Sequence, residues 1–310
     1  MRSNKDVLAK ADMTVTDLIN DGGYLLDEKA KKFLRKMIEQ ANFMPAVFMR
    51  GLKSHTAKLE KIGFGSRVMH AATSGQALPE SQRSKATTET VTITTHEAKA
   101  EIRLPYDVLE DNIEGKQMEN TIMAALRERV GVDLDELFIQ GITTSADPYL
   151  AMFNGGLAAA TSHAVNAAGA ALETTLLSSI KKSMPNKYRR DKAKMVYMTS
   201  HNAQHDYIDQ LSNRGTALGD AFLTGTREPG FHGIPVRAFD MMPEDQGIGT
   251  NQTSCLLMNP KNFIGGIWRN IMLETDKDIS AGVVIIVATF RVGANYQEED
   301  AVVNTSAIAT

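Results

Sequence analysis

The chain has 310 residues, 43% of them hydrophobic, and its formal net charge is −3 at pH 7. This composition allows a sizeable core and argues against a disordered chain, and the small net charge gives no general reason to expect nucleic-acid or membrane binding. Cys255 is the only cysteine, so no intrachain disulfide can form and a reducing, cytosolic site of synthesis is expected. The longest apolar run, residues 283–290, is too short to span a membrane.

The N-terminal segment changes from polar to basic. Residues 1–21 are polar, and a Gly-Gly turn at residues 22–23 precedes a predicted helix over residues 28–40, with Asp27 as its N-cap. Between residues 29 and 61, nine Lys or Arg stand against two Glu, a local charge of +7 that leaves −10 for the other 277 residues. A solvated helix face explains this excess, and contact with an acidic neighbour or a polyanion is the alternative.

The next segment, residues 64–104, alternates like a β-ribbon. Residues 88–95 and 98–104 place apolar side chains between polar ones, which predicts two strands, and residues 66–72 are the expected return strand. The ribbon has few large apolar side chains to bury, and an isolated hairpin is only marginally stable in water. Because no segment of the same chain is evident as its cover, we predict that the ribbon lies against another subunit.

A long helix follows the ribbon. Residues 106–112 predict a short helical turn, and a helix of about 25 residues begins near residue 116, which gives a length of roughly 37 Å. Its apolar positions recur every fourth residue, at Met118, Ile122, Leu126, Val130 and Leu134, and Leu137 and Phe138 continue the row. Steps of four residues turn this stripe by about 40° each time, so the two ends of the helix should contact different neighbours.

The C-terminal half mixes helices and strands. A helix is expected over residues 172–184, and Ser200 is the expected cap of a second helix that ends at residues 213–215. Strands are expected over 194–199, 234–239, 254–258, 263–268, 270–274, 283–290 and 301–303. With helices grouped and strands mostly consecutive, this half is of the α+β class.

Several short segments, taken in their order and spacing, resemble the major capsid proteins of tailed bacteriophages, which have the Hong Kong 97 type fold. The segments are 104–111 (Leu-Pro-Tyr-Asp-Val-Leu-Glu-Asp), 138–141 (Phe-Ile-Gln-Gly), 154–157 (Asn-Gly-Gly-Leu), 188–190 (Tyr-Arg-Arg), 195–198 (Met-Val-Tyr-Met), 233–236 (Gly-Ile-Pro-Val) and 242–243 (Met-Pro). The first two resemble the entry and the exit of the family's spine helix. The resemblance extends over residues 20–305.

The resemblance implies an α+β fold of the Hong Kong 97 type with five parts. These are an N-terminal arm (1–61), an extended loop that forms a β-hairpin (62–104), a peripheral domain with a long spine helix (105–193), an axial domain (194–284) and a return to the peripheral domain with the C-terminus (285–310). Axial-domain loops of the family crowd the axis of a ring of subunits, so residues 213–229 are expected there.

The function that the resemblance implies is structural, not enzymatic, and needs no cofactor. Subunits would self-assemble into hexamers and pentamers that form an icosahedral head enclosing double-stranded DNA. Expected partners are other copies of the chain, a scaffolding protein, a portal, decoration proteins and DNA packaged without sequence specificity. A scaffolding protein is expected because the sequence lacks the long N-terminal scaffolding segment of some members. The protein would be a virion component assembled in the host bacterial cytoplasm.

Two other functions are compatible with the residues. An encapsulin-type nanocompartment shell uses the same fold, and its gene would lie beside a cargo enzyme. A metal-dependent hydrolase would use His201 and His205, which are four residues apart on a predicted helix as metal-binding pairs are. No third ligand is evident near this pair, so a surface or capping role is the alternative.

Two single residues, Lys85 and Cys255, are candidates for side-chain chemistry. Some members of the capsid family join an extended-loop lysine to an asparagine of a neighbouring subunit, and Lys85 is the candidate here because it lies where the tip of the loop is expected. Its partner asparagine and assisting glutamate have no identifiable motif, so a solvated lysine is the simpler interpretation. Cys255 lies in an apolar strand and is predicted to be an inert core residue.

Overall fold

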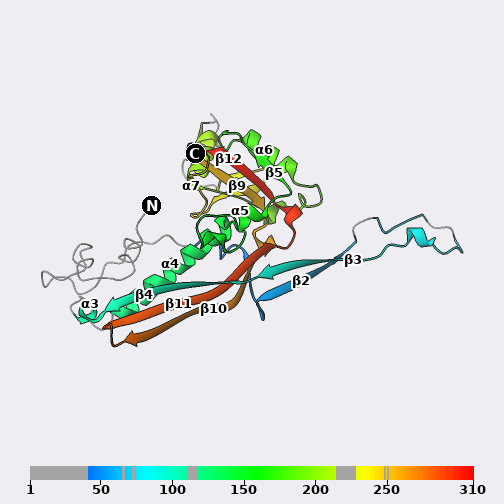
Figure 1. The fold of residues 1–310 in the computed structure, drawn as a ribbon. Helices are drawn as coiled ribbons and strands as arrows, with labels where there is room; N and C mark the ends of the chain where they lie inside the picture. The colour runs from blue at the N-terminus through cyan, green and yellow to red at the C-terminus, as the bar shows by residue number, and fades with distance from the viewer. Residues whose placement is uncertain are drawn as a thin grey trace.

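The computed structural model describes residues 41–64, 67–71, 74–110, 118–213, 228–247, 249 and 251–310 (Figure 1). The helix expected over residues 28–40 and most of the loop over 213–229 lie outside the described residues. The α-helices in the described residues are α3 (Tyr106–Glu110), α4 (Met118–Gln140), α5 (Gly156–Ala159), α6 (Thr174–Ser183) and α7 (His201–Ser212). The short 3-10 helices are η1 (Glu80–Gln82), η3 (Leu150–Met152), η4 (Lys192–Lys194), η5 (Pro260–Asn262) and η6 (Glu299–Ala301). Among the described helices, none combines the length and the apolar content that a membrane crossing requires.

A four-stranded sheet forms the elongated part of the molecule (Figure 1). Its strands, in spatial order, are β1 (Phe48–Gly51), β10 (Phe263–Asp278), β11 (Val283–Tyr296) and β4 (His96–Pro105). All pairs are antiparallel except β1 with β10, which is parallel. Alternate side chains of β11 are buried in the same core as α4, so this helix covers one face of the sheet.

A six-stranded sheet forms the compact part. Its order is β5 (Ala164–Asn166), β12 (Val303–Ala309), β9 (Gln252–Met258), β6 (Val196–Thr199), β8 (Ile234–Ala238) and β7 (Gly230–Phe231). On β6, Tyr197 lies in the core formed with α6 and α7, whereas Val196 and Met198 lie in the core shared with α4. Ser200 caps α7 as predicted, because its side chain accepts a hydrogen bond from the Ala203 N–H. This sheet therefore joins both parts of the molecule.

A third sheet, of two strands, is the hairpin of β2 (Thr56–Gly63) and β3 (Thr87–Thr94). The return strand expected over residues 66–72 is wrong, because β3 pairs with β2 along its full length and residues 67–71 contain no strand. The alternation of Ala57 and Leu59 with polar residues could have predicted strand β2. The lysines of this segment favoured a solvated arm instead. Similarly, the two strands expected over 263–268 and 270–274 are one strand, β10, which register shifts interrupt between Ile267 and Met272.

The domain boundaries that the resemblance implied stay a proposal, and several elements cross them. From the peripheral range 105–193, α6 packs on the six-stranded sheet, where β5 is the edge strand. From the axial range 194–284, β10 pairs with β11 in the four-stranded sheet. The last strand, β12, returns to the six-stranded sheet, where it pairs with β9. The chain therefore passes between the two larger sheets more than once.

The predicted apolar stripe of the long helix is confirmed. Helix α4 runs from Met118 to Gln140, and Leu126, Val130, Leu134, Leu137 and Phe138 are buried in the main core. The predicted difference between its two ends is also confirmed. Met118 is buried against Val108 of α3, whereas Phe138 lies edge-on to Phe263 of β10 with ring centroids 6.2 Å apart. The helix thus connects the far end of the long sheet with the centre of the molecule.

Two glycines allow the backbone after α4 to pack closely against the end of the helix. The Gly155 N–H donates to the Gly141 carbonyl oxygen at 2.8 Å. A Cβ on Gly141 would lie 2.5 Å from the Phe153 oxygen, and one on Gly155 would lie 2.7 Å from the Phe138 oxygen. No side chain fits between these backbones, which explains why segments 138–141 and 154–157 both carry glycine.

A buried carboxylate fixes the segment where the described chain begins. Asp135 of α4 is 1% exposed and accepts hydrogen bonds from the N–H groups of Phe43 and Met44, both at 2.8 Å. Burial raises the pKa of Asp135, and these backbone donors partly oppose the shift. Phe43 packs edge-on against Phe239 and Phe263. Asp135 therefore holds an aromatic anchor of the core in place.

We expect Asp135→Ala to lower the free energy of unfolding by about 2–4 kcal/mol, because the buried N–H group of Phe43 and the partly buried N–H group of Met44 lose their acceptor. Chemical denaturation followed by circular dichroism measures this loss. Asp133→Ala is the matched control on the same helix: its side chain is 36% exposed and pairs with Arg129, so less than about 1 kcal/mol should be lost. Equal losses for the two variants would contradict the anchoring role.

Candidate functional site

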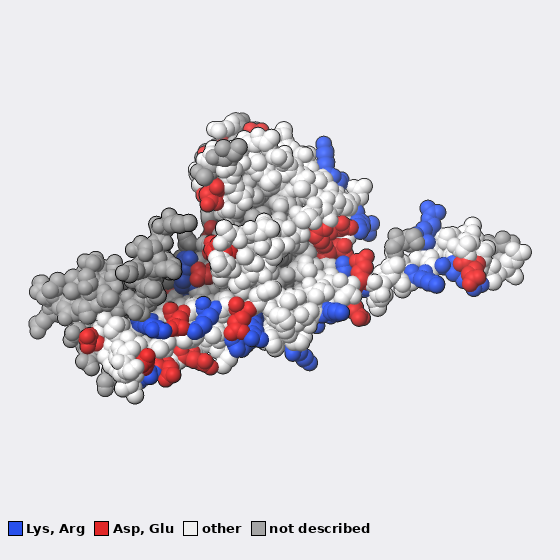
Figure 2. All heavy atoms as spheres, viewed as in Figure 1, with Lys and Arg blue, Asp and Glu red and all other residues white. Residues whose placement is uncertain are grey.

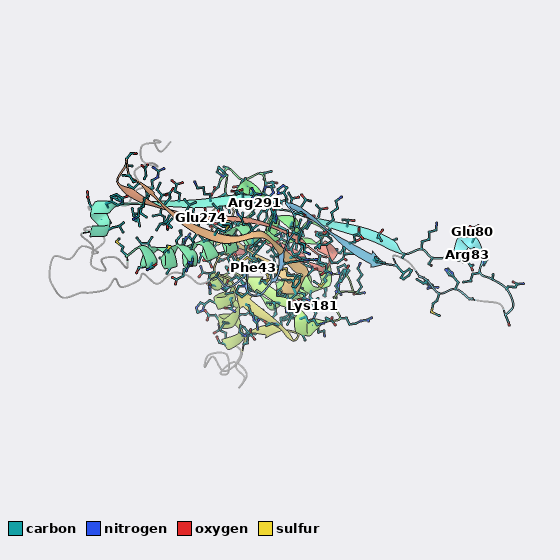
Figure 3. All side chains as sticks on the ribbon, turned by 90° about the horizontal axis from the view of Figure 1, so that it is seen from below. Phe43, Glu80, Arg83, Lys181, Glu274 and Arg291 are labelled. Atoms are coloured by element: carbon teal, nitrogen blue, oxygen red, sulfur yellow. The ribbon has the colours of Figure 1, made fainter. Side chains whose placement is uncertain are left out.

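The β2–β3 hairpin and its loop project away from both larger sheets. The two strands pair from Thr56↔Thr94 to Gly63↔Thr87, and residues 64–86 connect them. In Figure 1 the connecting loop extends beyond the rest of the molecule, and the turn η1 lies near its outer end. Figure 3 shows Glu80 and Arg83 far from the labelled residues of the body. The outer part of this hairpin therefore has no cover from its own chain among the described residues.

Large apolar side chains lie exposed at this projection. Ile62, Phe64, Val68 and Met69 are 74%, 60%, 46% and 84% exposed. Scattered exposed apolar residues are ordinary, but four within eight positions of one projecting segment mark a contact surface. We name residues 62–69 together with the loop to residue 86 the projecting hairpin. Its composition agrees with the prediction that this part of the ribbon needs a partner surface.

The connecting loop is also basic. Over residues 64–86, Arg67, Arg83 and Lys85 stand against one carboxylate, Glu80. Figure 2 shows blue Lys and Arg atoms beside the red carboxylate at this end of the molecule. All four of these side chains are exposed. A partner surface with negative charge would complement the loop.

The inner half of the ribbon is covered, which corrects part of the prediction. Strand β4 pairs with β11 over ten residues, and Ala98 and Leu104 are buried in the main core. At the base of the hairpin, Ile93 is fully buried and packs with Leu52 and Ile264. The prediction of a cover from another subunit therefore remains only for the outer hairpin and not for the whole of residues 65–103. The alternation in β4 arises because one side faces its own core.

A pair of glycines forms the seat of the hairpin on the long sheet. Gly266 of β10 and Gly293 of β11 are register partners. A Cβ on Gly293 would lie 2.1 Å from the Thr94 oxygen, and one on Gly266 would lie 2.7 Å from Leu52 Cδ1 and 3.1 Å from Ile93 Cγ2. The backbone of β3 crosses the sheet in this space. The two glycines therefore set how closely the hairpin approaches the body.

One lysine links the hairpin to the body by charge. Lys61 Nζ lies 3.2 Å from Glu89 Oε2 on the facing strand and 3.3 Å from Glu298 Oε2 on the body. Burial alone would lower the pKa of Lys61, but hydrogen bonds to these two carboxylates outweigh it and raise the pKa above its usual value. Lys61 is counted with the basic arm in the sequence, whereas in the structure its ammonium group connects the two hairpin strands with Glu298 of the body.

Lys85 lies on the returning limb of the loop, between η1 and β3. It is exposed and stands two residues before the first residue of β3, Thr87, so it is nearer to the hairpin than to the outer end of the loop. The expected position at the tip of the loop stays a prediction. The cross-link itself stays a proposal.

The histidine pair considered for a metal lies on the surface. His201 Nε2 is 2.6 Å from Asp240 Oδ1, and His205 Nε2 is 3.8 Å from Asp209 Oδ2. Each histidine has its own carboxylate, and no cluster of three or more His, Cys, Asp or Glu suited to a metal occurs in the part of the chain that the structure describes. Cys255 is fully buried in β9, and burial raises the pKa of its thiol to about 12.

Sequence comparison groups the chain with phage capsid proteins. Residues 22–306 match the family model described as the phage capsid family. A protein of Bacillus subtilis (strain 168) that is named as a prophage capsid protein, YqbE, is 37% identical over 303 residues. This match covers 96% of the present chain and 97% of the relative.

Solved capsid structures share the fold. The capsid of the native GTA particle has a TM-score of 0.68 at 17% identity and covers 96% of this chain and 100% of its own. The capsid of Myoviridae phage XM1 has a TM-score of 0.64 at 11% identity, with 91% and 97% covered. The satellite phage P4 procapsid, whose structure includes the size determination (Sid) protein, has a TM-score of 0.62 at 13% identity, with 98% and 95% covered.

Proposed function

Because the chain belongs to the phage capsid family, we propose that it builds the shell of a tailed-phage head through contacts made by the projecting hairpin. The protein is a major capsid protein, and its α+β fold is of the Hong Kong 97 type, as the resemblance implied. The single observation that supports the role of the hairpin is its uncovered apolar surface. Met69 and Ile62, at 84% and 74% exposure, would otherwise remain in water.

The geometry of the hairpin favours ring formation. The eight residues of β2 alone span about 26 Å, and the loop extends further. A projection of this length can lie on a neighbouring subunit while the same subunit receives the projection of the next one. Such heterologous contacts close into rings when the rotation between subunits allows it. We propose hexamers and pentamers that tile an icosahedral head.

The remaining partners are proposals from family membership. They are a scaffolding protein, a portal, decoration proteins and double-stranded DNA packaged without sequence specificity, with assembly in the host bacterial cytoplasm. The presence of the Sid protein in the P4 procapsid structure supports the idea that shells of this fold assemble with separate proteins. The role is structural in the family and its relatives, and we propose that this chain has no enzymatic activity. The phage relatives favour a phage head over an encapsulin-type compartment.

Assembly of the purified full-length chain tests this function. We expect rings or closed shells in negative-stain electron micrographs, together with an early-eluting peak in size-exclusion chromatography, when the chain is produced alone or with the proteins encoded beside its gene. The reason is that the apolar hairpin surface is buried only between subunits. A chain that stays monomeric under every one of these conditions would count against a shell-forming role.

Lys85 is tested on the same particles. Since no partner asparagine or glutamate has been identified, we expect boiled particles to give one band near 33.9 kDa in denaturing electrophoresis. A ladder of multiples of this mass would reveal covalent joining of subunits. Loss of that ladder in Lys85→Arg would then assign the bond to this lysine, because arginine keeps the charge but is not acylated in this way.

A further inference from the structure

A basic surface lies at the C-terminal end of α6, apart from the projecting hairpin. Over residues 181–194, seven Lys or Arg stand against one carboxylate, Asp191, a local charge of +6 that leaves −9 for the rest of the chain. We name the seven cations the basic face: Lys181, Lys182, Lys187, Arg189, Arg190, Lys192 and Lys194. They extend from the last turn of α6 to the end of η4. Figure 3 shows Lys181 far from Glu80 and Arg83 of the projecting hairpin, so the two basic regions are separate.

The end of α6 accounts for only some of these cations. Lys181 and Lys182 lie in its last turn, where positive charge interacts favourably with the helix dipole. Arg189 donates hydrogen bonds to the carbonyl oxygens of Lys182 and Met184 and so satisfies acceptors at the helix end. The other four cations lie beyond the helix, so its dipole and its free carbonyl groups do not explain them.

Carboxylates of the same chain neutralise only part of the basic face. Lys187 Nζ lies 3.8 Å from Asp300 Oδ2, and Lys194 Nζ lies 3.4 Å from Asp191 Oδ2. The side chains of both pairs are at least half exposed, so each pair contributes little. No other ion pair of the basic face joins two residues that the structure describes. Most of its positive charge therefore faces solvent without a partner from the described chain.

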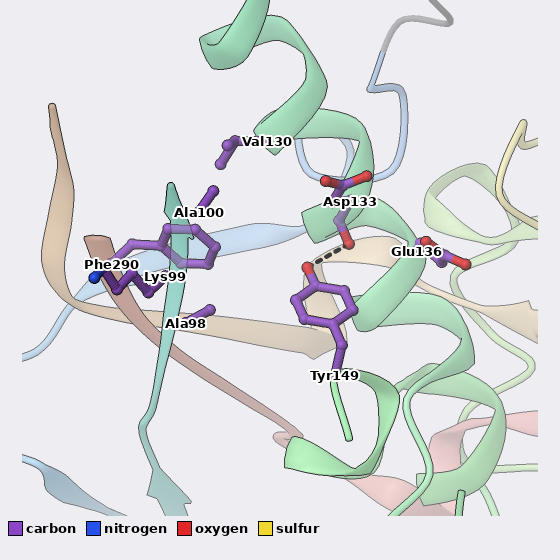
Figure 4. Close-up of a pocket in the computed structure, with 8 residues that line it drawn as sticks. All are labelled: Ala98, Lys99, Ala100, Val130, Asp133, Glu136, Tyr149 and Phe290. Carbon is purple, nitrogen blue, oxygen red and sulfur yellow. Dashed lines mark hydrogen bonds between the residues drawn. The ribbon is translucent and has the colours of Figure 1, made fainter. Parts of the chain in front are cut away.

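The cations of the basic face are close enough to affect one another. Burial lowers the pKa of Lys181, and the positive charges of Lys192 and Arg189 lower it further. The cavity of about 280 Å³ beside α4 differs, because both signs of charge, from Lys99 and Asp133, line it (Figure 4). The basic face has an excess of one sign, which an anionic partner would relieve.

The composition of the basic face favours phosphate groups over a protein surface as this partner. The centre of a protein–protein interface is rich in aromatic and apolar side chains, and lysine is depleted there. None of the exposed large apolar side chains of the described residues lies between residues 181 and 194, whereas five of the seven cations are exposed. Contacts with a nucleic-acid backbone are made chiefly by lysine and arginine and need no apolar surface.

We propose that the basic face binds the phosphate backbone of double-stranded DNA and lies on the inner side of the shell. This proposal rests on the proposed function, because a shell meets the DNA that it encloses on its inner side, and it names the surface that makes the contact. Phosphate contacts carry no sequence information, so duplexes of different sequence should bind equally well. The contact is electrostatic, so it should weaken steeply as the salt concentration rises.

Charge reversal tests the contact. The triple variant Lys182→Glu, Arg190→Glu, Lys192→Glu changes three exposed side chains that have no ion pair within the described residues. Fluorescence anisotropy with a labelled duplex of about 30 base pairs measures the affinity at several salt concentrations. We expect the affinity at low salt to fall by about tenfold or more, and the slope of log affinity against log salt to become shallower by roughly 2–3.

A second triple variant, Lys53→Glu, Lys58→Glu, Lys277→Glu, is the matched control. These three lysines are exposed and lie outside the basic face, and their reversal changes the net charge by the same amount. The affinity for the duplex should fall by no more than about threefold, because charges far from the contact are screened. An equal loss in the two triple variants would overturn the proposal, since any cation of the chain would then serve.

Lysine acylation gives a second readout that needs no substitution. The unmodified full-length chain is treated with an amine-acylating reagent, with and without the duplex, and the modified lysines are identified by mass spectrometry. We expect DNA to protect Lys182 and Lys192 and to leave the modification of Lys58 and Lys277 unchanged. Polyglutamate at equal charge concentration is the comparison for an acidic protein partner, and it should protect the basic face less than DNA does.

The outcomes separate the contact from the proposed function. If the unmodified chain forms no shells in electron micrographs, the proposed function fails. If shells form, but DNA protects neither Lys182 nor Lys192 or polyglutamate protects them better, the DNA contact is overturned while the function stands. If the basic-face variant does not fold, as circular dichroism would reveal, the acylation pattern of the unmodified chain decides the question.

Discussion

A chain in which residues 64–86 are replaced by an Asn-Gly turn is expected to fold and to form no shells. Gly63 and Thr87 are register partners at the end of the hairpin, so a two-residue turn can join them without changing the strands. Phe64, Val68 and Met69 are removed, and all three are exposed. The free energy of unfolding should change by no more than about 1 kcal/mol, since none of the described side chains between residues 64 and 86 is buried.

The measurements are negative-stain microscopy for shells and chemical denaturation for stability, both compared with the full chain. A loop of the same length made of Gly and Ser is the matched control, because it keeps the reach of the hairpin and removes its side chains. If this control also fails to assemble, the side chains carry the contact. Shells at normal yield from the shortened chain would show that the projecting hairpin is dispensable.

The largest expected loss of stability follows from Gly293→Ala. The added Cβ would lie 2.1 Å from the oxygen and 2.9 Å from the carbonyl carbon of Thr94. Both are backbone atoms, so no rotation of a side chain relieves the overlap, and β3 must move away from β11. Ile93, which is fully buried at this crossing, then loses its packing. We expect the free energy of unfolding to fall by about 3 kcal/mol or more.

Gly63→Ala is the matched control for this substitution. It is a strand glycine of the same hairpin, and a Cβ there would have no atom within 4 Å. Its free energy of unfolding should stay within about 0.5 kcal/mol of the unmodified chain. Equal stability of the two variants in urea titrations would contradict the close crossing of hairpin and sheet. A loss in Gly293→Ala that is accompanied by failed assembly would connect the seat of the hairpin to shell formation.

Local periodicity was enough to predict the elements whose pattern depends on their own residues. The stripe from Met118 to Phe138 predicted α4, and Ser200 predicted the start of α7. The order of short segments around the spine helix was enough to identify the family. The structure explains why two of these segments carry glycine: the backbones at Gly141 and Gly155 are in direct contact and leave no room for a side chain.

The strands that the sequence did not predict correctly have either a charged composition or an irregular pairing. Strand β2 was missed because its lysines continue the basic composition of the arm, although Lys61 lies between Glu89 and Glu298 in the fold. Strand β10 was divided because its register shifts disturb the alternation. The end of β11 beyond Phe290 was missed because Gly293, Ala294 and Asn295 do not have the composition of a strand.

The sequence by itself determined the long helix, most strands, the α+β class and the family, since these follow from residues that are close together in the chain or recur in a set order. Only the tertiary structure decided that β4 is covered by its own body and that the outer hairpin, among the described residues, is not. These features depend on pairs such as Thr94 with Gly293 and Ala98 with Val130, which lie far apart in the sequence and meet only when the strands are paired.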